Sequence, residues 1–214
     1  MINSVESNRV AIIGEIVQNF SFSHEYHGVG IFFADIGVKR FSKYIDTIPV
    51  MVSERIIDVD KYHTGMKISI KGQYRSRNKY EDGKRRLMLY VLAGEIKPID
   101  DVEEYDTYNQ IFLNGYIYKE PIYRKTPLGR HITDLFIAVN RPNGKADYIP
   151  CICWEKNARY VSQLPIGAKC MVWGRIQSRE YMKRLPDGQI SKRIAYEVSV
   201  NEVETEEFED ESKG

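Results

Sequence analysis

The chain has few cysteines and no long hydrophobic run. Its three cysteines, Cys151, Cys153 and Cys170, are an odd number, and two of them lie two positions apart in what reads as one strand, which argues against a disulfide framework. No segment approaches the roughly 18 apolar residues that cross a membrane, and the first ten residues lack the basic and apolar regions of a secretion signal. We therefore expect a cytoplasmic protein without disulfides.

Sequence motifs typical of enzymes and metal sites are lacking too. The chain has no phosphate-binding loop, and the glycine pair in the segment 28–30 lacks the third glycine of a dinucleotide site. Cys151 and Cys153 do not have the two-residue spacing of common zinc or redox pairs, and His24 and His27 share a polar loop without a nearby cysteine. We expect no catalytic activity, no metal ion and no cofactor.

An excess of one charge is also absent. The chain of 214 residues has 31 Lys and Arg against 30 Asp and Glu, a formal net charge of +1, which at first argues against a nucleic acid as partner. Its 43% of hydrophobic residues excludes a mainly disordered chain. The length suffices for one large domain or for two of about 100 residues.

What the sequence does contain is an internal repeat. At an offset of 101, identical residues meet at five positions in the first half: Asn8, Gly14, Gly28, Val38 and Arg40. The segment 46–52 (DTIPVMV) falls on 147–153 (DYIPCIC), and at an offset of 102 the segment 65–77 (GMKISIKGQYRSR) falls on 167–179 (GAKCMVWGRIQSR). The repeat predicts two copies of one fold.

The repeat also divides the chain and its charge. We place a first domain at 1–97, an acidic linker at 98–108, a second domain at 109–203 and an acidic tail at 204–214. The two domains have 15 basic residues each, against 11 and 8 acidic ones, whereas the linker and the tail have 5 and 6 acidic residues and one basic residue between them. Near-neutrality is therefore an average of two basic domains and two acidic segments, and it does not exclude a nucleic acid.

Within each copy, strands dominate. In the segment 148–154, Ile149, Cys151 and Cys153 alternate with Tyr148, Pro150, Ile152 and Trp154, as in a strand with one face in a barrel. Each copy has one short helical pattern, at 56–65 and at 157–165, which ends at a Gly or a Pro. Five strands with one short helix between the third and fourth predict an all-β chain of two tandem OB-fold five-stranded barrels.

The second copy resembles the bacterial single-stranded DNA-binding proteins. The resemblance spans nearly all of 109–203 and rests on AVNRP at 138–142, D-x-I-x-C-x-x-W-x-K at 147–156 and G-R-x-x-S-R-x-Y at 174–181. The first copy resembles the family more weakly. The resemblance implies single-stranded DNA binding without sequence preference in DNA replication, recombination and repair, near the nucleoid. It also implies a homodimer that presents four OB folds.

Single-strand binding needs aromatic faces for the bases and a basic path for the phosphates. Alternation puts Tyr148 and Trp154 on one outward face of a strand, roughly 20 Å apart at about 3.3 Å per residue. Both positions match stacking aromatics of the family, as does Tyr181. The alternative is that these rings cap the barrel or line an interface.

Basic residues of the second copy are candidate phosphate contacts. They come from the turn 124–130, from the long hairpin 179–193 and from positions that match polar or basic family positions near the groove: Arg124, Lys125, Arg130, Arg179, Lys183, Arg184, Lys192, Arg193, Arg141, Lys156 and Arg175. Any one of them could equally be a surface residue without a special role.

The first copy lacks the aromatic platform, because Thr47 and Ser53 stand where the second has Tyr148 and Trp154. We expect weaker binding there through the hairpin 75–86, and the candidates are Arg75, Arg77, Tyr80 and the nearby Tyr74. The alternatives are that this hairpin is only a solvated one, or that the first copy is an assembly domain.

Other features leave the function open. The acidic tail partly resembles the tip with which family members recruit replication and repair proteins, but it could equally be an exposed solvating end. Trp173 is a candidate for the contact between copies or subunits. The alternatives for the whole protein are a primosome-type or RNA-binding OB-fold protein and a structural assembly module.

Overall fold

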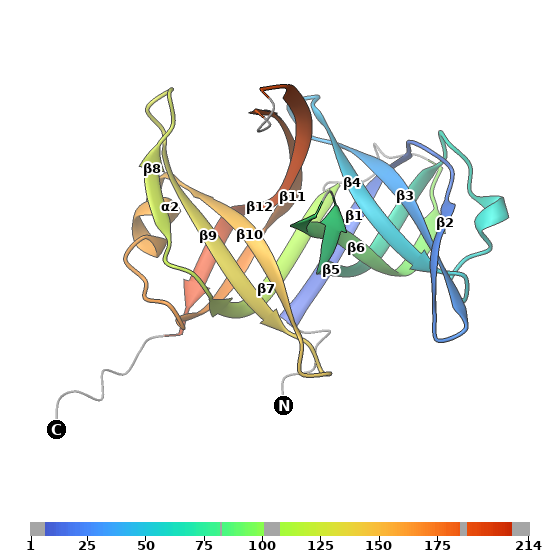
Figure 1. Cartoon of the computed structure of the whole chain (residues 1–214), viewed down its shortest axis with the longest axis horizontal. Helices are drawn as coiled ribbons and strands as arrows, with labels where there is room; N and C mark the ends of the chain where they lie inside the picture. The colour runs from blue at the N-terminus through green and yellow to red at the C-terminus, as the bar shows by residue number, and fades with distance from the viewer. Residues whose placement is uncertain (1–6, 82, 101–107, 185–187, 207–214) are drawn as a thin grey trace.

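The computed structural model describes residues 7–81, 83–100, 108–184 and 188–206, which form two β-barrels side by side (Figure 1). The strands of the first half are β1 (Asn8–Ile16), β2 (Ser21–Tyr26), β3 (Val29–Lys39), β4 (Ile45–Ser53), β5 (Lys67–Glu81) and β6 (Lys84–Pro98). Pairing in the order β1, β5, β6, β4, β3 and back to β1 closes a five-stranded barrel, and β2 adds an edge strand to β3. This is the OB-fold barrel expected from the sequence.

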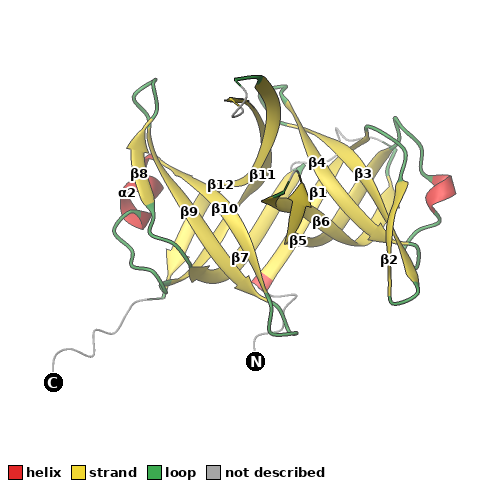
Figure 2. Ribbon diagram, in the orientation of Figure 1, coloured by secondary structure: helices red, strands yellow, loops and turns green. Residues whose placement is uncertain are grey.

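The second half repeats this topology. Its strands are β7 (Asn109–Ile117), β8 (Ile122–Lys125), β9 (His131–Asn140), β10 (Ala146–Trp154), β11 (Lys169–Arg184) and β12 (Ile190–Thr205). The barrel closes in the order β7, β11, β12, β10, β9 and back to β7, with β8 as the added edge strand. Strands make up most of both barrels, as Figure 2 shows.

The small apolar residues of the alternating segments line the two barrel interiors. Val50 and Val52 of β4 are fully buried, and their counterparts Cys151 and Cys153 of β10 are 3% and 0% exposed. The cysteines of the described residues are free thiols, and burial raises the pKa of Cys153 and of Cys170 to about 12. The thiols therefore act here as small core side chains.

The two halves differ in the helix between the third and fourth barrel strands. In the second barrel α2 (Glu155–Val161) buries Ala158 and Val161. In the first barrel one 3-10 turn, η1 (Val59–Lys61), takes its place and buries none of its residues. Valine and aspartate are poor helix formers, and without a buried face nothing extends the turn. Among the described residues, no helix is long and apolar enough to span a membrane.

The barrels are joined edge to edge through β1 and β7, which pair antiparallel. In their register, Val10 lies opposite Ile111, and these two residues are equivalent in the repeat. Equivalent residues that face each other mark a local two-fold axis, so the two halves of one chain meet as the subunits of a symmetric dimer would. One twelve-stranded sheet results.

Two buried carboxylates hold the barrels together on either side of this axis. Asp147 accepts hydrogen bonds from the backbone N–H of Ser76 at 2.6 Å and from Arg75 and Arg141. Asp46 likewise accepts from the backbone N–H of Ser178 at 2.6 Å. Its cations are Arg40, at 2.5 Å, and Arg175, at 3.6 Å. Each aspartate is fully buried, and these donors compensate its charge.

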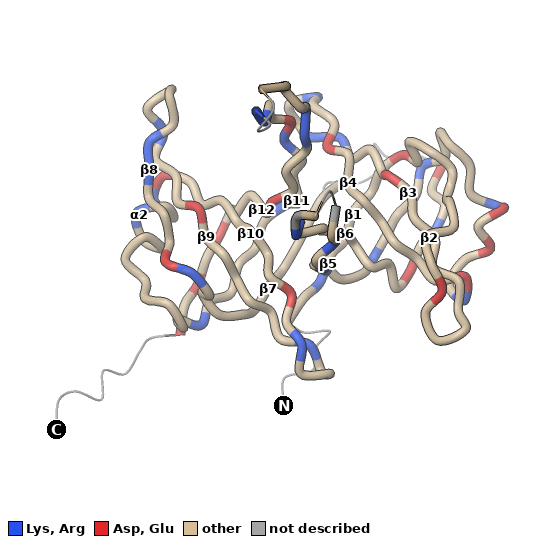
Figure 3. The backbone as a smooth tube through the Cα atoms, viewed as in Figure 1, with Lys and Arg blue, Asp and Glu red and all other residues tan. Residues whose placement is uncertain are grey.

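The longest hairpin, β11–β12, extends beyond the body of the second barrel, on the same side as the hairpin β8–β9 (Figure 1). Lys and Arg gather along β8 and on the outer part of β11, as Figure 3 shows. The two arms therefore flank the outward face of β10 with positive charge.

Candidate nucleic-acid interface

The outward face of β10 carries the two aromatics expected there. Tyr148 is 39% exposed and Trp154 is half-buried, while Ile149, Cys151 and Cys153 face the interior. In the β9–β10 ladder Tyr148 lies opposite Ala138 and Trp154 opposite Ile132. Both rings are thus on the outside of one sheet surface, where a flat ligand can reach them.

Trp154 is fixed in place and lies beside a cation. Its indole Nε1 donates to the hydroxyl of Ser199 at 3.2 Å. The guanidinium of Arg130 lies 5.2 Å from the ring centroid, within cation–π range. The guanidinium of Arg130 also lies 3.9 Å from the carboxylate of Glu155. An accessible ring and a cation therefore lie side by side at this end of β10.

Tyr148 belongs to an aromatic cluster that the sequence did not reveal. The ring of Tyr118 lies 4.6 Å from that of Tyr148 and 6.4 Å from that of Phe136. The ammonium of Lys119 is 5.2 Å from the Tyr118 ring and 4.8 Å from the Phe136 ring. Phe136 could have been found from the alternation in β9, which places it opposite Pro150 on the outward face. Tyr118 follows the end of β7, where no periodicity points to it.

The β11–β12 arm carries Tyr181, which is 36% exposed and has the guanidinium of Arg179 at 5.9 Å. Lys183 and Arg184 are exposed further along the arm. Lys192 is paired with Glu180 at 2.7 Å, and Arg193 is half-buried. The arm thus combines one accessible ring with several cations.

The other expected cations of the second barrel differ in their surroundings. Arg124 makes two hydrogen bonds to Asp134, at 2.7 and 3.0 Å, and hydrogen bonding to Asp134 raises the pKa of Arg124. Lys125 on β8 and Lys156 on α2 are exposed. Arg124 must therefore share its charge with a carboxylate, whereas the two lysines present theirs to solvent.

Three arginines of the expected set lie at the contact between the barrels. Arg75 and Arg141 bind Asp147, and the hydrogen bond to Asp147 raises the pKa of Arg141. Arg175 lies 3.6 Å from Asp46. Burial lowers the pKa of Arg175, and repulsion from the nearby Arg40 lowers it further. Arg75 and Arg141 thus have a structural task, which the sequence did not indicate.

The hairpin of the first barrel presents fewer groups than the sequence suggested. Tyr80 is 74% exposed and Arg77 is half-buried. Tyr74, by contrast, is fully buried in the barrel core, where burial raises its pKa, so the expectation that it could contact a nucleic acid was wrong. Most of the acidic linker (101–107) and of the acidic tail (207–214) lies outside the described residues.

Residues 108–205 match the model of the single-strand binding protein family. This part of the chain is similar to the proteins of that family. The match covers the second barrel, whose outward face holds Tyr148 and Trp154.

Proteins named as single-stranded DNA-binding proteins match over less than half of the chain's length. The single-stranded DNA-binding protein 3 of Listeria innocua is 38% identical over 93 residues, which are 40% of this chain and 55% of the relative. The single-stranded DNA-binding protein of Bacillus cereus is 36% identical over 93 residues, which are 40% of this chain and 52% of the relative. The chain spans about half the length of these relatives.

Solved structures extend the likeness of the fold to both barrels. The wild-type single-stranded DNA binding protein from Thermus aquaticus has a TM-score of 0.74 and 21% identity, and it aligns with 94% of this chain and 93% of its own. The tandem arrangement of two OB-fold barrels is therefore shared with a known structure.

Proposed function

We propose that this protein binds single-stranded DNA without sequence preference, and that its second barrel supplies most of the stacking. The observation that carries the proposal is the outward face of β10, where Trp154 and Tyr148 are accessible on one surface. Arg130 lies 5.2 Å from the ring of Trp154, and Lys119 lies beside the aromatic neighbour of Tyr148. Rings next to cations are what a strand of stacked bases and phosphates requires.

Such binding needs unpaired bases. A base in a duplex already stacks on its neighbours, so duplex DNA offers no free face to these rings and binds through its phosphates alone. Lysines and arginines that neutralise phosphates release condensed counterions, which makes the affinity depend on salt. We further propose that the protein is a binding protein without catalysis or cofactor. It would cover single strands during DNA replication, recombination and repair in the cytoplasm.

An oligo-dT titration tests this function. Tryptophan fluorescence should be quenched on binding, and the logarithm of the affinity should fall linearly with the logarithm of salt concentration. A duplex of equal length should compete poorly. Absence of binding at low salt would instead favour a structural assembly module. Preference for an equivalent RNA would favour the primosome-type or RNA-binding alternative.

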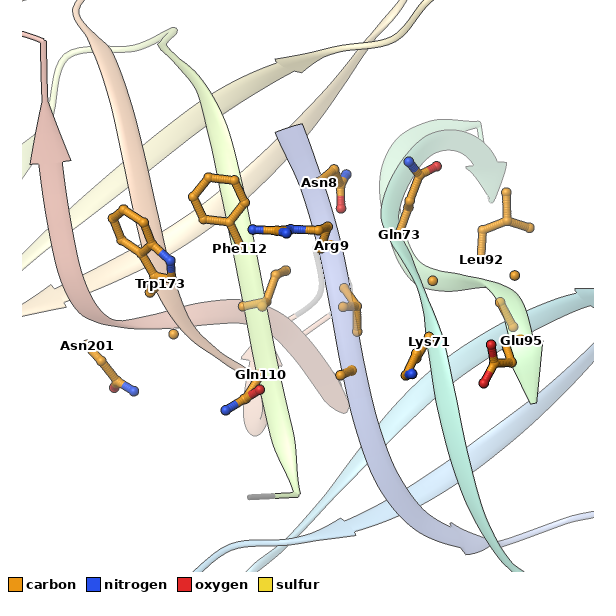
Figure 4. A pocket seen from close by; sticks show the side chains of 17 residues that line it. Asn8, Arg9, Lys71, Gln73, Leu92, Glu95, Gln110, Phe112, Trp173 and Asn201 are labelled. Atoms are coloured by element: carbon orange, nitrogen blue, oxygen red, sulfur yellow. The ribbon is translucent and has the colours of Figure 1, made fainter. Parts of the chain in front are cut away.

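We also infer that two chains pair into a homodimer with four barrels. A groove crosses the outer surface of the joined sheet on both sides of the local two-fold axis, and Phe112 and Trp173 line it with rings 5.0 Å apart (Figure 4). Arg9 of the first barrel lies over the Phe112 ring at 4.9 Å. An apolar face of this kind suits contact with a second copy of the chain. In a dimer with two-fold symmetry, the same surface patch of both chains forms the interface.

Light scattering tests the pairing. The first barrel has Lys71 where the second has Trp173, so Trp173→Lys is a substitution that the fold already accommodates in its own repeat. The wild type should have the mass of two chains and the variant that of one. A wild type with the mass of one chain would contradict the pairing. Recruitment of replication or repair proteins through the acidic tail stays a prediction from the sequence.

A further inference from the structure

A cavity of about 480 Å³ lies between the two barrels at the Trp154 end of the β10 face. Both barrels line it. The first contributes Arg40 and Tyr44, from the loop between β3 and β4, and the second contributes Arg130, Trp154, Arg175 and Arg179 among others. The first barrel thus reaches the platform of the second through this loop.

Arginines dominate the lining of this cavity. Four guanidinium groups and the carboxylate of Glu180 line it, and the other carboxylates near these arginines are Asp46, Glu155 and Glu197. Asp46 is fully buried behind the cavity and is shared by Arg40 and Arg175, while Glu180 is paired with Lys192. The buried Nη1 of Arg175 lies 3.6 Å from Oδ2 of Asp46 and has no hydrogen-bond partner within the described residues. A buried donor in this state favours an anion as ligand.

Aromatic rings accompany the cations on both sides. The guanidinium of Arg40 lies 4.6 Å from the ring centroid of Tyr44, and that of Arg130 lies 5.2 Å from the centroid of Trp154. Tyr44 is 48% exposed. One ring from each barrel thus borders the same cationic cavity, an arrangement that suits an anion with flat groups on either side of it.

The mirror position of the repeat lacks this combination. There a second groove is lined by the loop from Arg141 to Lys145 and by residues of the first barrel that include Tyr26, Arg55, Arg75 and Tyr90. The repeat equivalents of Tyr44 and Trp154 are Lys145 and Ser53, and Gln73 takes the position of Arg175. Within the described residues, the mirror groove thus has tyrosines and arginines at other positions, and the combination of Trp154, Tyr44 and Arg175 occurs only at the cavity beside the β10 face.

We infer that this cavity holds a phosphate of a bound single-stranded nucleic acid, with Arg40 and Tyr44 of the first barrel completing the binding site of the second. The strand would leave the Trp154 platform across the phosphate held by Arg175 and place its next base near Tyr44. The first barrel thereby serves binding through its loop, although its own platform is missing. The inference rests on the proposed function.

A fluorescent reporter at position 44 tests it. The chain has two tryptophans, so Trp154→Phe with Trp173→Phe gives a silent background into which Tyr44→Trp is introduced. Phe41→Trp in the same background is the matched control, since Phe41 is on the same loop, is 84% exposed and does not line the cavity. Anisotropy of a labelled oligo-dT of about 12 nucleotides, within the usual range for one OB fold, measures binding independently.

Quenching at position 44, with little at position 41, is the expected result. An unquenched indole at position 44 while the labelled oligonucleotide binds would overturn the inference and leave the proposed function intact. An oligonucleotide that fails to bind even the wild-type protein would overturn both.

A charge variant tests the phosphate contact. Arg175→Gln introduces the residue that the first barrel has at this position, and Arg159→Gln on the exposed surface of α2 removes the same charge away from the cavity. Arg175→Gln should lower the slope of log affinity against log salt by about 0.7, the loss of one phosphate contact on a single strand. Arg159→Gln should leave the slope unchanged. Equal slopes for wild type and Arg175→Gln would contradict the contact.

Inorganic phosphate distinguishes a strand from a free anion. At constant ionic strength it should not displace the short oligonucleotide, because the strand is also held by stacking. Displacement by phosphate in the wild type, lost in Arg175→Gln, would identify a site for free anions and overturn the assignment to the strand.

Discussion

Ser76 in the first barrel donates its backbone N–H to the buried carboxylate of Asp147 in the second barrel, at 2.6 Å. The hydroxyl of Ser76 in turn accepts from the backbone N–H of Tyr148 at 2.8 Å. The contact between barrels therefore positions the strand that carries Tyr148, one of the proposed stacking rings. Stability of the contact and geometry of the platform are linked at this point.

Asp147→Asn should destabilise the protein strongly. The amide would leave Arg75 and Arg141 without their buried counter-charge, and breaking a buried pair costs about 3 to 5 kcal/mol. Asp134→Asn is the matched control, because the pair of Asp134 with Arg124 is partly exposed and should cost at most about 1 kcal/mol. Urea unfolding measures both. Similar losses in the two variants would contradict the structural role of Asp147.

Trp154→Ala should weaken oligo-dT binding by about 1 to 3 kcal/mol, the usual effect of removing one stacking platform. Trp173→Phe, on the outer surface of the joined sheet, should leave the affinity of each chain nearly unchanged. Anisotropy titrations at matched salt compare them. If Trp154→Ala bound as tightly as the wild type, the platform would have to lie elsewhere.

Stability should fall in alkaline solution as the buried thiols ionise. The pKa of Cys153 and of Cys170 is raised by burial to about 12 from an ordinary value near 9, so the unfolded chain releases these protons first. The free energy of unfolding is therefore unaffected below about pH 9 and decreases from there toward pH 12, by up to about 1.4 kcal/mol per pH unit for each thiol.

A variant that copies the first half of the repeat checks this cause. Cys151→Val with Cys153→Val introduces the residues that the first barrel has at these positions, Val50 and Val52. Denaturant unfolding between pH 8 and about pH 11 should show a shallower alkaline loss than in the wild type. An identical pH dependence would mean that other groups, such as Tyr196 with its raised pKa of about 12, cause the loss.

Gly174→Ala should destabilise the second barrel by about 1 to 3 kcal/mol, the usual cost of overpacking. A Cβ at Gly174 would lie 2.2 Å from the carbonyl oxygen of Ser199, at the bulge of β11. Gly94→Ala is the control, since its nearest neighbour would be 3.8 Å away. Thermal unfolding compares the two, and equal midpoints would argue against a close approach at Gly174.

Much of the fold could be predicted because the same packing constraints appear in both copies of the repeat. Gly72 and Gly174 recur at the same position because a Cβ at either one would lie 2.2 Å from a backbone carbonyl oxygen of the neighbouring strand. The alternation of Tyr148 and Trp154 with small apolar residues placed both rings on the outward face of β10. These features are local or periodic, so one sequence carries them.

Partners distant in sequence could not be predicted. Arg75 and Asp147 are 72 positions apart, and charge alone does not distinguish an arginine that faces a carboxylate from one that faces solvent. A signal existed, because Asp46 and Asp147 recur in the repeat as charged residues at the start of a buried strand. Tyr118 escaped notice for the same reason, since its neighbour Tyr148 is brought to it by strand pairing and not by sequence.

The junction of β1 with β7 joins within one chain what a symmetric dimer would join between two. A covalent link keeps both edges at a high effective concentration, so this interface does not dissociate on dilution. The covalent link also allows the two halves to differ in sequence. A substitution at Tyr148 or Trp154 affects one barrel, whereas in a dimer of identical chains it would appear in both. One half can thus be dedicated to stacking while the other keeps its fold and contributes through its loops.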